Sequence, residues 1–132
     1  MDNEISKMEQ ILSILREKNK QMDNLMVFTK EMENAIEAND LETLGTVLSI
    51  RQESMDKVDR LPDELRGIIE AASQPFRERV KELLEPADER IDFGDPLETA
   101  ISDTNRLVFM MLKKIMALDE AINKKMKQGA PE

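Results

Sequence analysis

Residues 95–126 read DPLETAISDTNRLVFMMLKKIMALDEAINKKM and carry an apolar residue at nearly every a and d position of one unbroken heptad. Only Thr104 and Lys125 depart from it; the apolar positions are Leu97, Ile101, Val108, Met111, Ile115, Leu118 and Ile122. Such a long apolar stripe needs another long apolar face to pack against. The stretch therefore predicts an all-α protein, an elongated antiparallel bundle of three to four long helices with coiled-coil-like packing.

The same periodicity recurs along the rest of the chain, which we interpret as a single helical domain spanning residues 1–132. Apolar residues three and four positions apart predict helices over about 4–38, 40–61, 63–85 and 96–127. The second of these carries its own heptad stripe, which only Arg51 interrupts: Leu41, Leu44, Leu48, Met55 and Val58. We expect that stripe to face the core.

Capping residues and prolines suggest where these helices begin and end. Asn39, with Glu42 three residues later, predicts an N-cap for the second helix. Pro62 is expected to end that helix or to open the next one. Pro75 lies inside the third apolar pattern and predicts a kink, with Ser73 as an alternative cap.

The last long connection and the last helix start are marked more clearly. Residues 86–94 are the one stretch that reads as a substantial loop, and Asp95 followed by Pro96 predicts a capped helix start. Because four helices joined by short connections alternate in direction, we expect the first and the last helix to be antiparallel.

The composition limits the classes of partner. The 132 residues carry a net charge of −9, and 36% of them are charged. Nucleic acids and anionic membrane surfaces both require a concentrated positive face, so neither is an expected partner. Cysteine is absent, and no apolar run approaches the roughly 20 residues that span a bilayer. We therefore expect a soluble cytoplasmic protein that does not insert into membranes.

The side chains that most often perform catalysis are missing. The chain has no His, Cys, Trp or Tyr, which removes the commonest general base, the thiolate nucleophile and the usual zinc ligands. Asp88, Asp92 and Asp95 do not follow the ligand order of a calcium loop. We expect no enzymatic activity, no cofactor and no bound metal.

Two apolar runs are candidates for a partner surface. Residues 107–112 read LVFMML and would cover the whole circumference of a helix, including the side that faces water; residues 25–28 read LMVF. Phe109, Met110 and Met116 fall at b and c positions, away from the core stripe, and methionine adapts to varied apolar partners. The expected partner-binding residues are Phe109, Met110, Met116, Leu112, Met26, Val27 and Phe28.

Arg51 is the one charged residue in the second apolar stripe. We interpret it as a side chain that extends from a partly buried site to water, or that pairs with a carboxylate.

Four segments resemble a known family: residues 36–44 (IEANDLETL), 48–52 (LSIRQ), 58–61 (VDRL) and 115–122 (IMALDEAI). In a small acidic helical chain, they resemble the FlgN/FliT type of flagellar type III export chaperone. The resemblance covers most of the chain and does not separate the two chaperone types.

That resemblance implies a cytoplasmic chaperone that binds an amphipathic helix of a flagellar export substrate, the helical end of a hook-associated or filament-cap protein, and delivers it to the export apparatus. The competing interpretation is a structural or signalling coiled-coil protein whose apolar strip is a homodimer interface.

Overall fold

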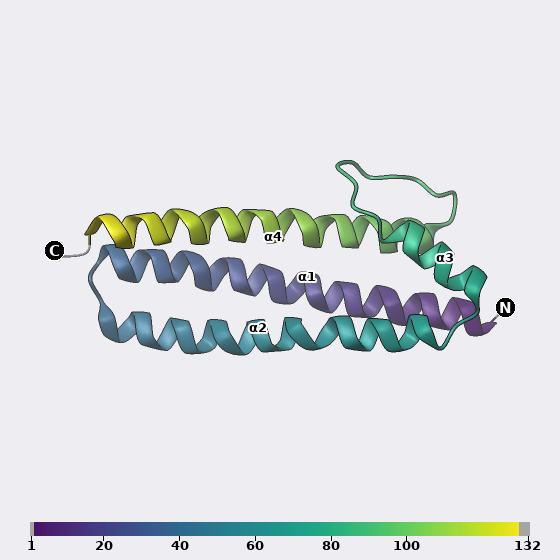
Figure 1. The fold of residues 1–132 in the computed structure, drawn as a ribbon, viewed down its shortest axis with the longest axis horizontal. Helices are drawn as coiled ribbons and strands as arrows, with labels where there is room; N and C mark the ends of the chain where they lie inside the picture. Colours follow the sequence, from purple (N-terminus) through teal and green to yellow (C-terminus); the bar gives the residue numbers. More distant parts are fainter. Residues whose placement is uncertain (1, 130–132) are drawn as a thin grey trace.

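The computed structural model describes residues 2–129, and the side chains of residues 3–127. That part of the chain forms four helices and no strand: α1 (Asp2–Glu37), α2 (Leu41–Glu70), α3 (Gln74–Leu83) and α4 (Pro96–Gly129). The three long helices lie side by side along the whole molecule, and α3 is a short helix at one end (Figure 1). The prediction of an all-α helical bundle is confirmed.

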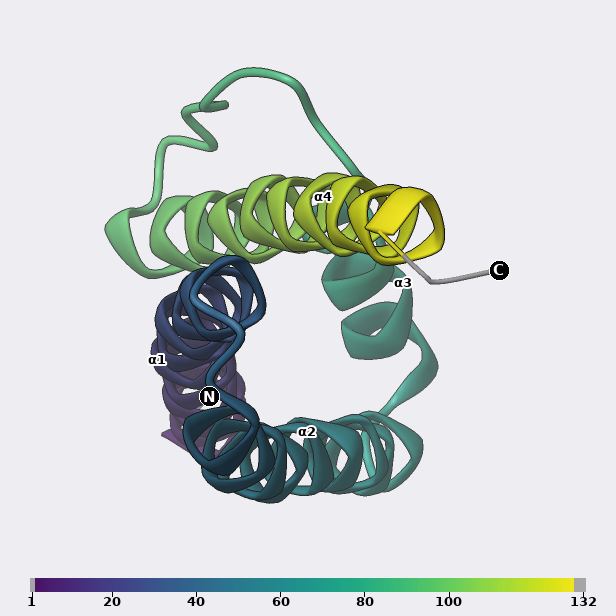
Figure 2. The ribbon, with the colours of Figure 1, turned by 90° about the vertical axis from the view of Figure 1, so that its left-hand side faces the viewer.

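The central element of the bundle is α1, because both α2 and α4 pack along it. Seen from the end, α2 and α4 lie on either side of α1 and face each other, and α3 lies between them on the side opposite α1 (Figure 2). The short helix therefore occupies the fourth position of a bundle over only part of its length.

The core consists of three apolar clusters arranged along α1. The first joins the N-terminal part of α1 to α3 and contains Ile11, Val80 and Ile101. The second and third lie further along and contain Leu25 with Val108 and Ile115, and Met32 with Val47 and Ile122. The a positions of the last heptad are all buried: Ile101, Val108, Ile115 and Ile122. This confirms the core stripe of α4.

The expectation that the first and last helices are antiparallel is wrong. Ile11 shares a cluster with Ile101 near the start of both helices, and Met32 shares another with Ile122 near their ends. The two helices are therefore parallel, as their colours along the sequence also show in Figure 1. The reason is that α3 is short. The irregular segment after it leads the chain back, so α4 begins at the same end of the bundle as α1.

The turn between α1 and α2 corrects the predicted N-cap. Asn39 adopts a left-handed backbone with φ of 55°, and the backbone N–H of Asp40 donates to the carbonyl of Ala35 at 2.9 Å. Asn39 thus ends α1, a position that asparagine tolerates. Asp40 caps α2 instead, because its Oδ1 accepts a hydrogen bond from the backbone N–H of Thr43 at 3.1 Å.

Both internal prolines behave differently from the sequence prediction. Pro62 lies inside α2, which continues to Glu70, because later residues of that helix still pack on the first core cluster. Packing outweighs the lost backbone hydrogen bond here. Pro75 causes no kink: the chain leaves helical geometry before it, and Ser73 is the N-cap of α3, which confirms the alternative. The predicted helices 40–61 and 63–85 are therefore wrong in their bounds.

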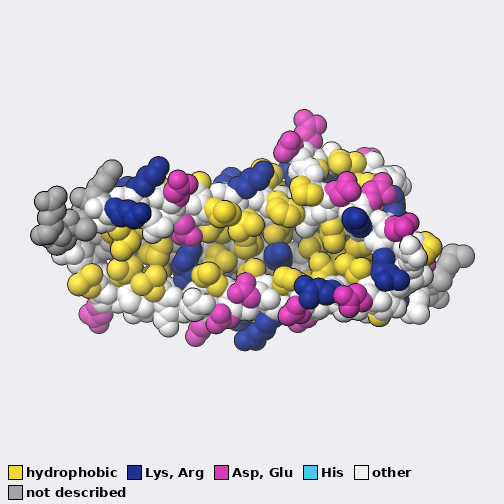
Figure 3. Space-filling model, in the orientation of Figure 1, with side chains coloured by type: hydrophobic (Ala, Val, Ile, Leu, Met, Phe, Trp, Pro, Cys, Tyr) yellow, Lys and Arg dark blue, Asp and Glu magenta, His cyan; other side chains and the backbone are white. Residues whose placement is uncertain are grey.

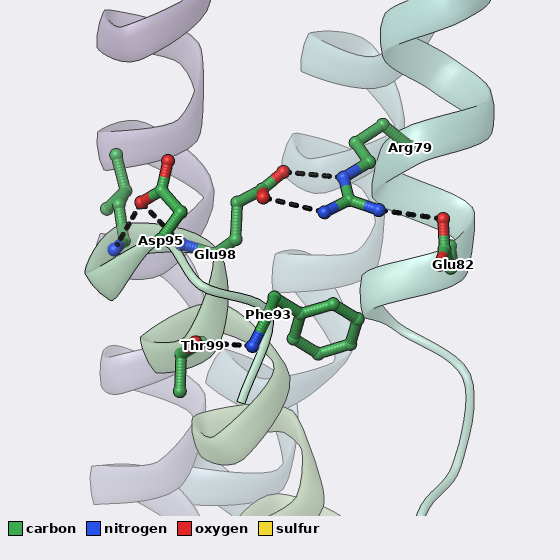
Figure 4. Close-up of polar contacts among 7 residues, drawn as sticks. Arg79, Glu82, Phe93, Asp95, Glu98 and Thr99 are labelled. Carbon is green, nitrogen blue, oxygen red and sulfur yellow. Dashed lines mark hydrogen bonds and ion pairs between the residues drawn. The ribbon is translucent and has the colours of Figure 1, made fainter. Parts of the chain in front are cut away.

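Polar contacts fix α3 to the first turn of α4 (Figure 4). The guanidinium of Arg79 donates two hydrogen bonds to the carboxylate of Glu98, from Nε at 2.6 Å and from Nη2 at 2.7 Å. The backbone N–H of Phe93 donates to Thr99 Oγ1 at 3.0 Å, so the end of the loop is tied down as well. Residues 84–95 contain no helix or strand, which confirms the predicted loop. Asp95 caps α4 through its contact with the backbone N–H of Leu97.

Candidate partner-binding groove

An apolar groove runs along the part of the bundle that α3 does not cover. Its floor is α1 and its walls are α2 and α4, and Figure 3 shows apolar side chains gathered between these walls. Two adjoining hollows of about 300 and 320 Å³ form it. The apolar side chains that line them, here called the open groove, are Met22, Leu25, Met32 and Ile36 of α1, Leu44, Leu48, Met55, Val58 and Pro62 of α2, and Leu112, Ile115, Met116, Ile122 and Met126 of α4.

The open groove begins where α3 ends. The α1 residues packed with α3 in the first core cluster run from Met8 to Leu15, and the α1 residues that line the groove run from Lys18 to Ile36. The groove is therefore a continuation of the surface that α3 covers. At 1.5 Å per residue, this uncovered floor is about 27 Å long.

The expectation that the heptad stripe of α2 faces the core holds only in part. Leu44, Met55 and Val58 pack against core clusters and also line the groove. The side chains that α2 buries are Val47 and Ser54, which each precede a stripe residue by one position, and Leu61, which follows the last stripe residue by three. Two stripe residues remain well exposed, Leu41 at 73% and Leu48 at 44%. A regular heptad stripe on α2 thus lacks a complete helical partner among residues 3–127.

The wall formed by α4 is exposed in the same way. Met116 is 61% exposed and Met126 49% exposed, and both line the hollows. Large apolar side chains are therefore left in contact with water on both walls. Exposed apolar residues gathered in one groove mark an interaction site more often than isolated ones do.

One polar layer crosses the groove and separates its two hollows. Arg51 of α2 donates from Nη2 to Asp119 Oδ2 of α4 at 2.6 Å, and from Nε to Thr29 Oγ1 of α1 at 3.1 Å. Arg51 and Asp119 line both hollows. The interpretation of Arg51 as the partner of a carboxylate is confirmed. The other oxygen of Asp119, Oδ1, is buried and has no hydrogen-bond partner among the residues that the structure describes.

At the far end of the groove, Lys125 joins α4 to α1. Its Nζ lies 2.8 Å from Glu37 Oε1 and 3.2 Å from Glu33 Oε2. The hydrogen bonds that Lys125 donates to Glu37 and, to a lesser extent, to Glu33 raise the pKa of Lys125 above its ordinary value. All three side chains are in contact with water, so the ion pairs orient the helix ends more than they stabilise them.

The predicted partner residues of α4 lie on two different faces. Leu112 and Met116 line the open groove, and Phe109 belongs to the same face because it precedes them by three and seven residues. Met110 is 41% exposed but lies about 100° further around the helix, where its sulfur contacts Arg106. The four residues are exposed as expected, yet they do not form one strip.

The predicted residues of α1 belong mainly to the core. Met26 packs against the second core cluster and Phe28 against the third, so both are partly buried in the bundle itself. Val27 is 51% exposed and lines neither hollow.

The sequence interpretation missed the wall formed by α2. Leu44 and Met55 do pack on core clusters, but their second role as lining of the groove, shared with the exposed Leu48, was not predicted. A heptad stripe has the same appearance whether its partner helix belongs to the chain or to another molecule. One signal was available: Arg51 sits in that stripe, and a charged residue at such a position indicates incomplete burial.

Other surface features are weaker candidates. A wider and more open hollow of about 700 Å³ lies between the start of α1 and the end of α2, lined by polar side chains such as Asn3, Ser6 and Gln10 together with Ile14 and Ile68. In the region covered by residues 2–129, no cluster of three acidic side chains is arranged to hold a metal ion, and no helix is both long enough and apolar enough to cross a membrane.

Comparison of the chain with protein-family models, with curated proteins and with solved structures gave no significant match.

Proposed function

We propose that this protein is a non-catalytic chaperone that holds one amphipathic helix of another protein in the open groove. The observation that supports the proposal is that the position opposite α1, between α2 and α4, is filled by α3 at one end of the bundle and is an apolar groove along the rest. A helix laid into an apolar groove is a common mode of peptide recognition.

The short helix α3 illustrates the kind of segment that fits. It presents Phe76, Val80 and Leu83 to the bundle, at helical spacings of four and three, and all three are buried. Its remaining face carries charged side chains. A partner helix with one apolar and one charged face would cover the part of the bundle that α3 leaves open and would bury Leu48 and Met116.

The resemblance of the sequence to FlgN/FliT-type chaperones supports a specific class of client. The proposed client is the helical end of a flagellar hook-associated or filament-cap protein, which the chaperone keeps unpolymerised in the cytoplasm before delivery to the export apparatus. A net charge of −9 would favour solubility of the chaperone while its groove is unoccupied.

The proposal is tested by calorimetric titration with synthetic peptides covering the terminal helices of the hook-associated and filament-cap proteins from the source organism. We expect one of these peptides to bind in a 1:1 ratio. Leu48→Glu and Met116→Glu place a charge on either wall and should each weaken this binding at least tenfold, because a charge buried without a partner is costly.

Matched controls come from exposed apolar residues outside the groove. Ile50→Glu on α2 and Met110→Glu on α4 change side chains of 40% and 41% exposure, and they should leave the affinity unchanged. Equal loss of binding in the controls would place the client elsewhere. Failure of every peptide, together with a concentration-independent dimer in sedimentation, would instead support the homodimer interpretation.

A further inference from the structure

The polar layer in the open groove restricts which helix can bind, provided that the groove holds a helix as proposed above. Thr29 lies near the middle of the floor that runs from Lys18 to Ile36, and Arg51 and Asp119 meet above it. A helix of about 18 residues, the length that matches this floor, would therefore place the middle of its apolar stripe over the Arg51–Asp119 pair.

Covering this pair with an apolar side chain has a free-energy cost. The side chain of Asp119 is 34% exposed and that of Arg51 is 15% exposed, so both still contact water in the free protein. Asp119 Oδ1 is already buried without a hydrogen-bond partner, so the exposed part of this side chain is not at Oδ1. Oδ2 accepts one hydrogen bond, from Arg51, and a carboxylate oxygen can accept a second. Only two N–H groups of Arg51 have a partner among the side chains that the structure describes. A bound helix would remove the remaining water without replacing its hydrogen bonds.

The two charges also discriminate among polar side chains. A lysine on the partner would approach Asp119 but would be repelled by Arg51, and a glutamate would meet the opposite arrangement. A carboxamide carries a donor and an acceptor on one group. Its N–H group can donate to Oδ2 of Asp119, the carboxylate oxygen that is not buried, while its carbonyl accepts from the guanidinium of Arg51.

We propose that the Arg51–Asp119 pair selects a partner helix with an Asn or Gln side chain at the middle of its apolar stripe. The pair thereby fixes the register of the helix, because a shift by one or two turns would place the carboxamide on an apolar wall and an apolar residue on the pair. A single polar position fixes the register of coiled coils in the same way.

The test uses four synthetic amphipathic peptides of 18 residues with leucine at the other stripe positions and Gln, Leu, Lys or Glu at the central one. Their affinities are measured by fluorescence anisotropy. For the wild-type protein, we expect the Gln peptide to bind about tenfold more tightly than the other three, as one net hydrogen bond to a charged group would give.

A double variant separates this selection from general apolar binding. Arg51→Leu with Asp119→Leu makes the layer apolar, and the order of the Gln and Leu peptides should then reverse. The control pair is Arg106→Leu with Asp103→Leu, an ion pair of α4 at 2.8 Å that lines neither hollow, and it should retain the wild-type preference.

The possible results are distinguishable. If the peptides bind the wild-type protein but the Leu peptide equals or exceeds the Gln peptide, or if the preference survives in the Arg51→Leu/Asp119→Leu protein, the selection is refuted and the groove remains. If no peptide binds the wild-type protein, the groove and the selection are refuted together.

Discussion

The guanidinium of Arg51 crosses from α2 to the carboxylate of Asp119 on α4, with Nη2 2.6 Å from Oδ2. Among the side-chain hydrogen bonds and ion pairs that the structure describes, this is the one direct link between the two walls of the open groove. Since α2 and α4 otherwise meet mainly through α1, the pair holds the walls at a defined separation. A polar contact therefore sets the width of an apolar site.

The energetics of this pair are accessible through a double-mutant cycle. Arg51→Leu leaves the Asp119 carboxylate without its partner, and we expect the free energy of unfolding to fall by about 1–3 kcal/mol. Replacing both residues by leucine removes the unpaired charge together with the attraction, so the double variant should be closer to the wild-type protein. Urea denaturation checks both values, and a double variant less stable than Arg51→Leu would contradict this account.

The cap of α2 predicts a pH dependence. The Thr43 hydroxyl donates to Asp40 Oδ2 at 2.6 Å and the Thr43 backbone N–H donates to Oδ1, and these hydrogen bonds lower the pKa of Asp40. A carboxyl group with a lowered pKa in the folded state stabilises the protein above its unfolded pKa, ordinarily 3.8. This contribution is lost as the pH falls through the folded pKa.

The corresponding measurement compares melting temperatures at pH 7 and below pH 4. Asp40→Ala should melt at a lower temperature than the wild-type protein at pH 7, and the difference should shrink in acid. Asp40→Asn keeps a capping oxygen that does not titrate, so it should melt near the wild-type temperature at pH 7. A wild-type advantage over Asp40→Ala that grew in acid would rule out the cap as its source.

The sequence predicted the helices better than their arrangement, and the reason is the range of the interactions involved. The burial of Ile101, Val108, Ile115 and Ile122 follows from periodicity within one helix. The direction of α4 relative to α1 depends instead on how far α3 extends along the bundle before the following loop leads the chain back to the end where α1 begins. The length of α3 depends on where α2 ends, just before Ser73. The apolar pattern of the sequence continues across that point, so it does not show the break.

For a related reason, the sequence predicted only one wall of the candidate site, the wall that α4 forms. Met116 and Leu112 were predicted as partner residues because they are apolar and lie outside the core stripe of α4, which the other apolar residues of that helix already form. Leu44 and Leu48 were not, because they form a complete stripe themselves, and periodicity does not show whether the chain supplies the facing helix. Only the three-dimensional arrangement shows that this facing position is filled by α3 at one end and open elsewhere.

The contact between Arg79 and Glu98 predicts how firmly α3 is held. The hydrogen bonds that Arg79 donates to Glu98 raise the pKa of Arg79, and the bidentate geometry is one that lysine lacks. Glu98→Ala should make amide hydrogen exchange in α3 and in the loop 84–95 about tenfold faster, because a charge-assisted contact is lost. Glu82→Ala is the control, since its side chain is 58% exposed and should contribute little. Equal exchange in the two variants would mean that apolar packing alone holds α3.

The last prediction concerns two consecutive residues of α4. Ile115 is 5% exposed in the second core cluster, whereas Met116 is 61% exposed on the wall of the open groove. Ile115→Glu buries a charge without a partner and should lower the free energy of unfolding by about 3 kcal/mol or more. Met116→Glu leaves its charge in water and should change that energy by no more than about 0.5 kcal/mol. Thermal and urea denaturation measure both values in the absence of a partner. A comparable loss in the two variants would show that Met116 is packed within the bundle, and the open groove would then lack one of its walls.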